Sequence, residues 1–280
     1  EGDAAHPEGL AERVLEPDDG DDYFALLGVK YFADGALGSR GAALLADYSD
    51  DPGNRGLFVT SPEQLDRAVA VATASGWQVA THAIGDAGVH ATLDAYEHAI
   101  KANVGTDLRL RVEHAQVMTD DDLARMGKLG VIASMQPTHA TSDMPWAEAR
   151  LGPTRIKGAY AWRRVLDAGA LVVAGSDFPV EEVPVLRGIY AAVSRADDRG
   201  QPAGGWYPDQ KLTLDEAIFA FTAATAVAGF VEDHRGHLAP GLVADLTVYD
   251  RPLVAGPELL ATRVDLTVVG GEIVYERGAE

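Results

Sequence analysis

The chain has 280 residues, of which 47% are hydrophobic and 24% are charged, so it is long enough to bury a sizeable core in one or two domains. Its formal net charge of −20 argues against nucleic acid and anionic membranes as partners. The absence of cysteine excludes disulfides and thiolate metal sites, and without a signal peptide or an apolar segment of roughly 20 residues we expect a cytoplasmic protein with no role in a membrane.

The first part of the chain, residues 1–22, is rich in aspartate, glycine and proline, and we expect an acidic linker or tail there. The sequence opens at Glu1 instead of methionine, which leads us to expect a piece of a longer protein. Residues 24–32 follow, and they are apolar apart from Lys30. Such a run predicts a strand that is buried on both faces, as parallel sheets require.

Helix and strand signals then alternate. Ser61, Pro62 and Gln64 supply an N-cap, a first-turn proline and a capping-box partner, and together they predict a helix. Residues 78–81 predict the next strand, with His82 at its end. A second helix should follow, because apolar residues recur there at spacings of three and four.

The same strand-helix unit recurs further along the chain. Residues 108–113 predict a strand that ends at His114, and Thr119 caps a helix whose first turn is acidic, which its dipole favours. Residues 131–135 predict a further strand. A long polar loop over residues 136–158 follows, and loops of that length in a compact domain are usually functional or mobile.

A helix at 160–167 precedes a strand at 171–175, and Asp177 follows this strand closely. Further helices are expected at 183–195 and 213–224, the second opened by a capping box. The pattern then changes to short strands, and a Gly-Gly pair between the last two is a good hairpin turn. These strands are expected at residues 244–249, 266–269 and 272–275.

Strands that alternate with helices predict right-handed crossovers and a parallel sheet, so the expected fold class is α/β. About five strand-helix units are visible, whereas a closed (β/α)8 barrel of the TIM type takes eight. We expect an incomplete barrel as the catalytic domain over residues 23–235. A small β appendage over residues 236–280 should complete the chain.

Four potential metal ligands, Lys30, His82, His114 and Asp177, stand at or near the ends of expected strands. Because the carboxyl ends of parallel barrel strands open onto one face, these residues are expected to converge there. Imidazole is a preferred ligand of zinc and of its neighbours among the transition metals. A single histidine is more often structural, but two at equivalent positions of successive units predict a metal site.

Asp177 and Lys30 each allow more than one interpretation. A carboxylate after an apolar strand is costly to desolvate unless a cation or hydrogen-bond donors meet it, so Asp177 is either a metal ligand and proton acceptor or a helix N-cap. A lysine inside a buried strand should be paired, neutral, chemically modified or solvent-facing, and Asp34 is a candidate partner.

Three residues of the polar loop are candidates for substrate binding. Gln136 and His139 would hang over the strand ends, and the planar fork of Arg150 suits a carboxylate or a phosphate. The alternatives that remain open are a solvated histidine and a surface ion pair of the arginine.

The stretches that hold these residues resemble the amidohydrolase superfamily, specifically its YtcJ-like branch, amidohydrolase family 3. The resemblance covers the chain from about Tyr23 to the C-terminus, and the motifs occur in the family's order. The matching stretches are Val29–Arg40, Thr81–Asp86, Val112–Gln116, Gly175–Val180, Gly204–Trp206 and Gly236–Leu246.

The resemblance implies a (β/α)8 barrel with a small β-sandwich made from both chain ends, of which residues 236–280 would be the C-terminal portion. It also implies one or two divalent metal ions, with zinc as the expected metal. By this analogy a carboxylated Lys30 would bridge two metals, and His82 and His114 would bind the second. Asp177 would bind the first metal and act as the catalytic general base.

One feature of the family is missing from the chain. The family's first strand carries a His-x-His pair, and no such pair occurs here. We therefore expect that the N-terminal strand-helix units are absent and that the chain is either a truncated product or is completed by another chain. The expected protein partner is accordingly a second copy in a homo-oligomer or a complementing N-terminal segment.

The leading hypothesis is a metal-dependent amidohydrolase that cleaves a C–N bond of a small amide-type molecule through a metal-bound hydroxide, with Asp177 moving the proton. Two alternatives stay open. One is a non-catalytic fragment that needs a complementary N-terminal chain. The other is a deaminase or a cyclic-amide hydrolase of the same superfamily.

Overall fold

The computed structural model describes residue 17, residues 20–21 and residues 23–278. The chain divides into two compact units, of which the first comprises Glu1–Met135 and Asp143–Val172 and the second Gln136–Ser142 and Val173–Glu280. Most of the predicted linker at 1–22 lies outside the described residues, and its boundary with the catalytic domain stays a prediction. Within the described residues, no helix has the length and apolar character needed to cross a membrane.

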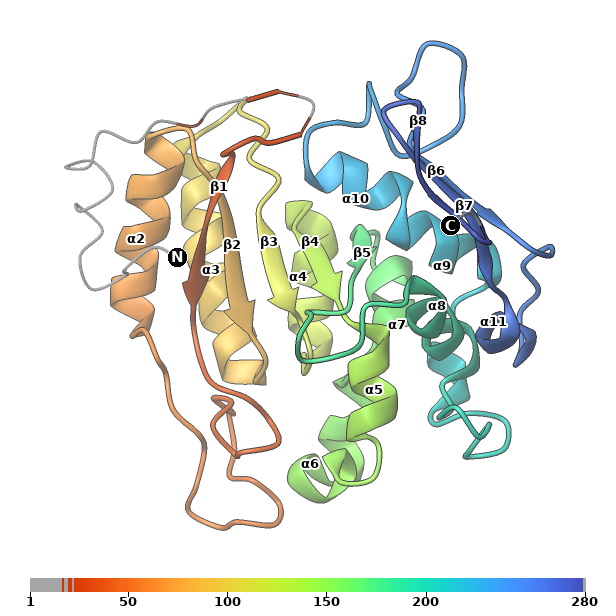
Figure 1. The fold of residues 1–280 in the computed structure, drawn as a ribbon. Helices are drawn as coiled ribbons and strands as arrows, with labels where there is room; N and C mark the ends of the chain where they lie inside the picture. The colour runs from red at the N-terminus through yellow and green to blue at the C-terminus, as the bar shows by residue number, and fades with distance from the viewer. Residues whose placement is uncertain (1–16, 18–19, 22, 279–280) are drawn as a thin grey trace. The chain divides into compact units, whose positions relative to one another are not determined.

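A five-stranded sheet has the strand order β1-β2-β3-β4-β5 (Figure 1). Neighbouring strands from β1 to β4 pair in parallel, which confirms the predicted α/β class. Each strand follows the last along both the chain and the sheet, as successive strand-helix units require. The bounds are β1 (Gly28–Phe32), β2 (Gln78–Ala83), β3 (Arg111–His114), β4 (Ile132–Met135) and β5 (Val172–Ala174).

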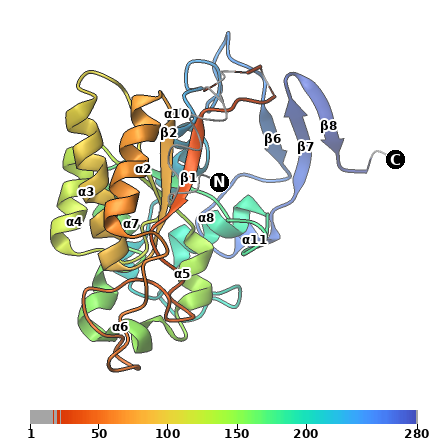
Figure 2. The same cartoon turned by 90° about the vertical axis from the view of Figure 1, so that its left-hand side faces the viewer.

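Helices α2 (Pro62–Ala74), α3 (Asp86–Ala102) and α4 (Asp120–Leu129) lie along one face of this sheet, as Figure 2 shows from the side. The predicted capping box of α2 is confirmed, because the Ser61 hydroxyl accepts from the Gln64 N–H and the Gln64 side chain accepts from the Ser61 N–H. At α4 the Thr119 hydroxyl accepts from the Asp122 N–H and caps the helix. Local hydrogen bonds therefore fix where these helices begin.

The predicted strand at 24–32 is shorter than expected. The Asp21 carboxylate accepts hydrogen bonds from the N–H groups of Tyr23 and Phe24, at 2.8 and 3.0 Å, and closes a turn there. Tyr23 and Phe24 are 81% and 67% exposed, so the strand begins only at Gly28.

The prediction of a long loop at 136–158 is wrong, because this stretch is largely helical. It contains α5 (Pro137–Asp143), α6 (Ala147–Arg155) and the 3-10 helix η1 (Ile156–Gly158). The helices were missed because they are short and lack apolar periodicity, and α6 is kinked where Gly152 has φ 74° before Pro153. The helix predicted next is confirmed as α7 (Trp162–Asp167).

The second unit contains α8 (Val185–Ser194), the 3-10 helix η2 (Pro208–Gln210), α9 (Leu214–Phe221) and α10 (Ala223–Ala228). The single helix predicted at 213–224 is two helices, because Thr222 leaves the helical conformation with φ −129° and ψ −92°. An antiparallel sheet with the order β6-β7-β8 follows, and positive φ at Gly270 and Gly271 confirms the hairpin turn. Its elements are β6 (Leu246–Tyr249), α11 (Glu258–Ala261), β7 (Val264–Val269) and β8 (Glu272–Glu276).

Candidate metal centre

Two of the predicted metal ligands lie side by side at the ends of neighbouring strands of the first unit. The ring centroids of His82 and His114 are 4.6 Å apart, and the ring planes meet at 72°. The side chain of His82 is 13% exposed and His114 is 6% exposed, so both imidazoles are largely shielded from water. Such a pair is a donor set that suits zinc or a similar divalent metal.

The backbone at the end of β3 explains why the two rings meet. Glu113, not His114, is the register partner of His82, and alternate residues of a regular strand point to opposite faces. His114 and Ala115 have φ values of 74° and 42°, so the chain leaves the strand conformation at the histidine. Left-handed conformations of non-glycine residues cost on the order of 1–3 kcal/mol and cluster at functional sites.

Lys30 lies on the same side of the sheet as His82. Its Nζ is 5.2 Å from the centroid of the Phe32 ring, and that ring is 5.4 Å from the His82 ring. Phe32 is also the register partner of His82. The lysine, the phenylalanine and the imidazole therefore follow one another across one face of β1 and β2.

Asp34 was a candidate partner of Lys30, but its role in the structure is to bind backbone N–H groups. Its carboxylate is 1% exposed and accepts hydrogen bonds from the N–H groups of Ala43, Ile84 and Gly85, at 2.8, 2.9 and 2.8 Å. Burial raises the pKa of Asp34 to about 7, although these hydrogen bonds act to lower it. An oxygen of Asp34 is also 3.7 Å from Nε2 of His82. Asp34 thus ties the segment after β1 to the end of β2, beside His82, whose Nε2 is 3.5 Å from the Gly35 carbonyl oxygen.

The described side chains supply some, but not all, of the ligands that a divalent metal needs. Across the described residues, no three His, Cys, Asp or Glu side chains gather closely enough to hold a metal ion. His82 and His114 fit as two ligands of such an ion. Lys30 would add a donor only in a neutral or a carboxylated form, because an ammonium has no lone pair.

Asp177 and His139 belong to the second unit, and they interact with each other. Burial lowers the pKa of His139, and the negative charge of Asp177 acts in the opposite direction. Asp177 has φ 55°, and its carbonyl accepts from the Val180 N–H at 2.9 Å. Asp177 is therefore not a helix N-cap, because α8 begins only at Val185.

Gln136 and Arg150, the other predicted substrate-binding residues, differ in their surroundings. Gln136 is 8% exposed, and its carbonyl accepts from the His139 N–H at 3.0 Å. Arg150, in the first unit, forms an ion pair with Asp50, donates to the Gly38 carbonyl at 3.3 Å and lies over the Trp146 ring. The ion pair that the sequence left open for Arg150 is therefore present, and a substrate role for either residue stays a prediction.

Comparison with known proteins gives consistent matches. The family described as Amidohydrolase family matches residues 3–275. Putative amidohydrolase YtcJ of Bacillus subtilis (strain 168) is 38% identical over 251 residues, which are 89% of this chain and 47% of that protein. N-substituted formamide deformylase of Arthrobacter pascens is 32% identical over 226 residues, which are 79% of this chain and 40% of that protein.

A solved structure is similar in both sequence and fold. The crystal structure of an uncharacterized metal-dependent hydrolase from Pyrococcus horikoshii OT3 matches with a TM-score of 0.75 and 32% sequence identity. The match covers 85% of this chain and 47% of that one. The chain thus spans less than half of the length of each of these three proteins.

Proposed function

Because the chain belongs to the amidohydrolase family, we propose that it carries part of the active site of a metal-dependent amidohydrolase that cleaves a C–N bond of a small amide. The observation that carries the proposal is the pair of imidazoles, His82 and His114, with ring centroids 4.6 Å apart at the ends of neighbouring parallel strands. The carboxyl ends of parallel strands are where enzymes of this architecture place their chemistry.

His82 and His114 would hold the metal, and zinc is the expected ion because it readily accepts neutral imidazole. Carboxylation of Lys30 would turn a cation in an apolar strand into an anionic donor on the same face. When bound, a divalent metal polarises a carbonyl and lowers the pKa of a coordinated water to about 7.

Asp177 would move the proton during hydrolysis. It would accept a proton from the attacking water and pass it to the leaving nitrogen as the C–N bond breaks. His139, whose pKa burial lowers, would be neutral at pH 7 and would donate a hydrogen bond to the oxygen of the substrate carbonyl. Gln136 and Arg150 would contact the rest of the substrate.

The test measures metal content and amide hydrolysis of the purified chain and its variants. His82→Ala and His114→Ala should each lower the bound metal, whereas His98→Ala, at a surface histidine paired with Asp66, should not. Asp177→Asn should lower hydrolysis of N-substituted formamides by at least about 100-fold. The proposal is abandoned if hydrolysis survives in Asp177→Asn without bound metal.

A second candidate is a chain that is inactive alone and needs a complementary N-terminal partner. It is supported by the position of β1 at the end of the strand order, and by relatives that are about twice as long as the matched region. Size-exclusion chromatography separates the candidates, because an open sheet edge favours oligomers or aggregates with less than a full metal complement. Deamination and cyclic-amide opening would use the same residues, and a substrate panel decides between these reactions.

A further inference from the structure

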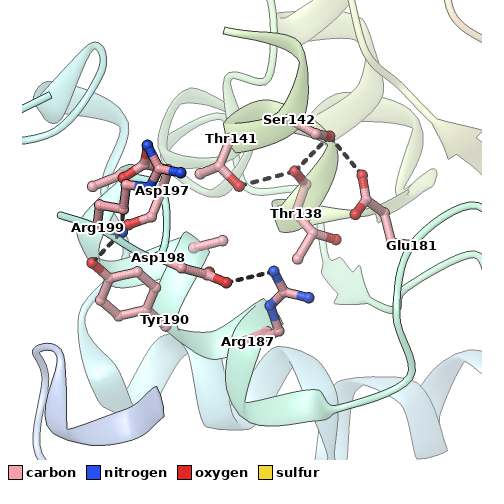
Figure 3. Close-up of a pocket in the computed structure, with 11 residues that line it drawn as sticks. Thr138, Thr141, Ser142, Glu181, Arg187, Tyr190, Asp197, Asp198 and Arg199 are labelled. Carbon is pink, nitrogen blue, oxygen red and sulfur yellow. Dashed lines mark hydrogen bonds and ion pairs between the residues drawn. The ribbon is translucent and has the colours of Figure 1, made fainter. Parts of the chain in front are cut away.

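Polar side chains outside the proposed metal ligands also bond to one another. In the second unit they surround a pocket of about 290 Å³ (Figure 3). There Arg187 pairs with Asp198 at 2.5 Å. The Ser142 hydroxyl donates to Glu181 at 2.5 Å, so these groups already satisfy one another. The first unit contains a buried polar cluster of a different kind, because its hydrogen bonds end next to a proposed metal ligand.

The backbone of the first unit turns sharply where β3 ends, at that ligand. His114 and Ala115 have φ values of 74° and 42°, and Tyr160, which bonds to the residue that follows them, has φ 50°. Non-glycine residues rarely adopt this left-handed conformation, and it persists only where the surrounding contacts over-determine it. The contacts that hold the turn therefore decide where the imidazole of His114 lies.

Backbone hydrogen bonds hold the chain directly after this turn. The Gln116 carbonyl accepts from the Tyr160 N–H at 2.7 Å, and Val117 forms an antiparallel bridge with Ala159. The Val117 N–H also donates to the Ile84 carbonyl, at 2.9 Å, and so joins the chain after β3 to the chain after β2. The end of the turn is thus fixed to two other segments of the same unit.

The side chains of Gln116 and Tyr160 add a second connection between these two residues. Gln116 Nε2 donates to the Tyr160 hydroxyl at 2.8 Å, and that hydroxyl donates to the Asp143 carboxylate at 2.7 Å. Gln116 is 4% exposed and Tyr160 is 2% exposed, so water competes little for these hydrogen bonds. Because backbone and side chains bond at once, neither residue can rotate without breaking a hydrogen bond. Gln116, Tyr160 and Asp143 are called the Tyr160 cluster below.

We propose that the Tyr160 cluster positions His114 for the metal by holding the left-handed turn. Glu113 is the register partner of His82, and alternate residues of a regular strand point to opposite faces. If the turn relaxed to regular strand geometry, the His114 ring would therefore point away from His82, and the pair with centroids 4.6 Å apart would separate. The inference rests on the proposed function, since it concerns a ligand of the same metal. In this role the cluster acts through His114 and needs no contact with the substrate.

The test removes the hydroxyl that links Gln116 to Asp143. Zn²⁺ alone, titrated into the purified chain and followed by isothermal titration calorimetry, should bind at least about tenfold more weakly to Tyr160→Phe than to the wild type. Gln116→Met keeps the length of the side chain without its N–H donor and should have a similar effect. Because both variants lose the same hydrogen bond, the double variant should stay within about twofold of the weaker single variant.

Tyr48→Phe is the matched control. Tyr48 is 1% exposed, and its hydroxyl donates to the Ala42 carbonyl at 2.8 Å, so this variant also loses a buried hydrogen bond of the first unit. Its affinity for Zn²⁺ should stay within about twofold of the wild type, even where urea denaturation shows a similar loss of stability. A second measurement needs no metal, because the Cα and Cβ chemical shifts of His114 report its backbone conformation. They should change in Tyr160→Phe and not in Tyr48→Phe.

An affinity for Zn²⁺ that is unchanged in both cluster variants, or lowered equally in Tyr48→Phe, would overturn the inference and leave the proposed function standing. Unchanged His114 shifts in Tyr160→Phe would overturn it as well. A wild-type chain that binds no Zn²⁺, with His114 shifts that move as expected, would reject the proposed function and leave the cluster's hold on the turn standing. If Tyr160→Phe does not fold by circular dichroism, the affinity and the His114 shifts of Gln116→Met decide.

Discussion

The parallel sheet and the C-terminal antiparallel sheet contain similar apolar residues but differ in what covers them. Val79, Thr81 and Ala83 of β2 are each 0% exposed. Every residue of β8 is exposed, and Ile273 and Val274 are each 61% exposed. The apolar content of a strand therefore does not decide its burial.

The connections between the strands account for the difference. A parallel pair needs a crossover, and here the crossovers α2, α3 and α4 cover the sheet. An antiparallel hairpin needs only the Gly270-Gly271 turn, which brings no covering helix. We expect substitutions in the first sheet to affect the free energy of unfolding strongly and those in β8 to affect it little.

The largest effect is expected at Asp34 in the first unit. Asp34→Ala leaves the N–H groups of Ala43, Ile84 and Gly85 without their acceptor, and each unsatisfied buried donor costs roughly 1–3 kcal/mol. The free energy of unfolding should fall by about 3–5 kcal/mol, measured by urea denaturation. Asp107→Ala, which breaks an exposed ion pair with Arg109, is the control and should change it by less than about 0.5 kcal/mol.

A change below about 1 kcal/mol in Asp34→Ala would contradict the anchoring role of this carboxylate. It would mean that the segment after β1 is held against the end of β2 by other contacts, such as the Ala33 N–H bond to the His82 carbonyl at 2.8 Å.

Ile132→Ala in β4 should have the next largest effect. Ile132 is 3% exposed, so truncation leaves a cavity in the core and should cost about 3 kcal/mol, within the usual range of roughly 2–5 kcal/mol. The same urea titration measures it. A midpoint that does not move would contradict the burial of Ile132 in the core of the first unit, because even a core that collapsed around the missing atoms would lose their burial.

Tyr96→Phe tests a polar contact beneath the same sheet. The Tyr96 hydroxyl is fully buried and lies 2.6 Å from the Arg111 carbonyl and 2.8 Å from the Thr81 hydroxyl. Its loss should lower the free energy of unfolding by about 1–2 kcal/mol, without creating a cavity. Tyr23→Phe, at a residue that is 81% exposed, should be neutral and serves as the control.

Local chemistry explains which parts of the fold the sequence predicts. The capping boxes at Ser61 and Thr213 are made within four consecutive residues, so the beginnings of α2 and α9 could be read directly. Helices α5 and α6 gave no such signal, because their residues show no apolar periodicity and Gly152 kinks the second one. Short helices of this kind depend on tertiary contacts that the sequence does not display.

In the candidate site, too, some features follow from the local sequence and others depend on tertiary contacts. The positions of His82 and His114 at the ends of successive strands were sufficient to predict that they would be neighbours. The left-handed backbone at His114 and the anchoring role of Asp34 were not predictable, because each depends on contacts between distant segments. The sequence did contain a signal for Asp34, because a carboxylate directly after an apolar strand needs hydrogen-bond donors.

The smallest effect is expected at Ile273 in β8, which matches Ile132→Ala in chemistry but not in burial. Ile273 is 61% exposed, so Ile273→Ala should change the free energy of unfolding by less than about 0.5 kcal/mol in the same urea titration. A cost close to that of Ile132→Ala would mean that another surface covers β8 in solution. Because a second copy of the chain would cover it only at sufficient concentration, repeating the titration over a range of protein concentrations would identify that partner.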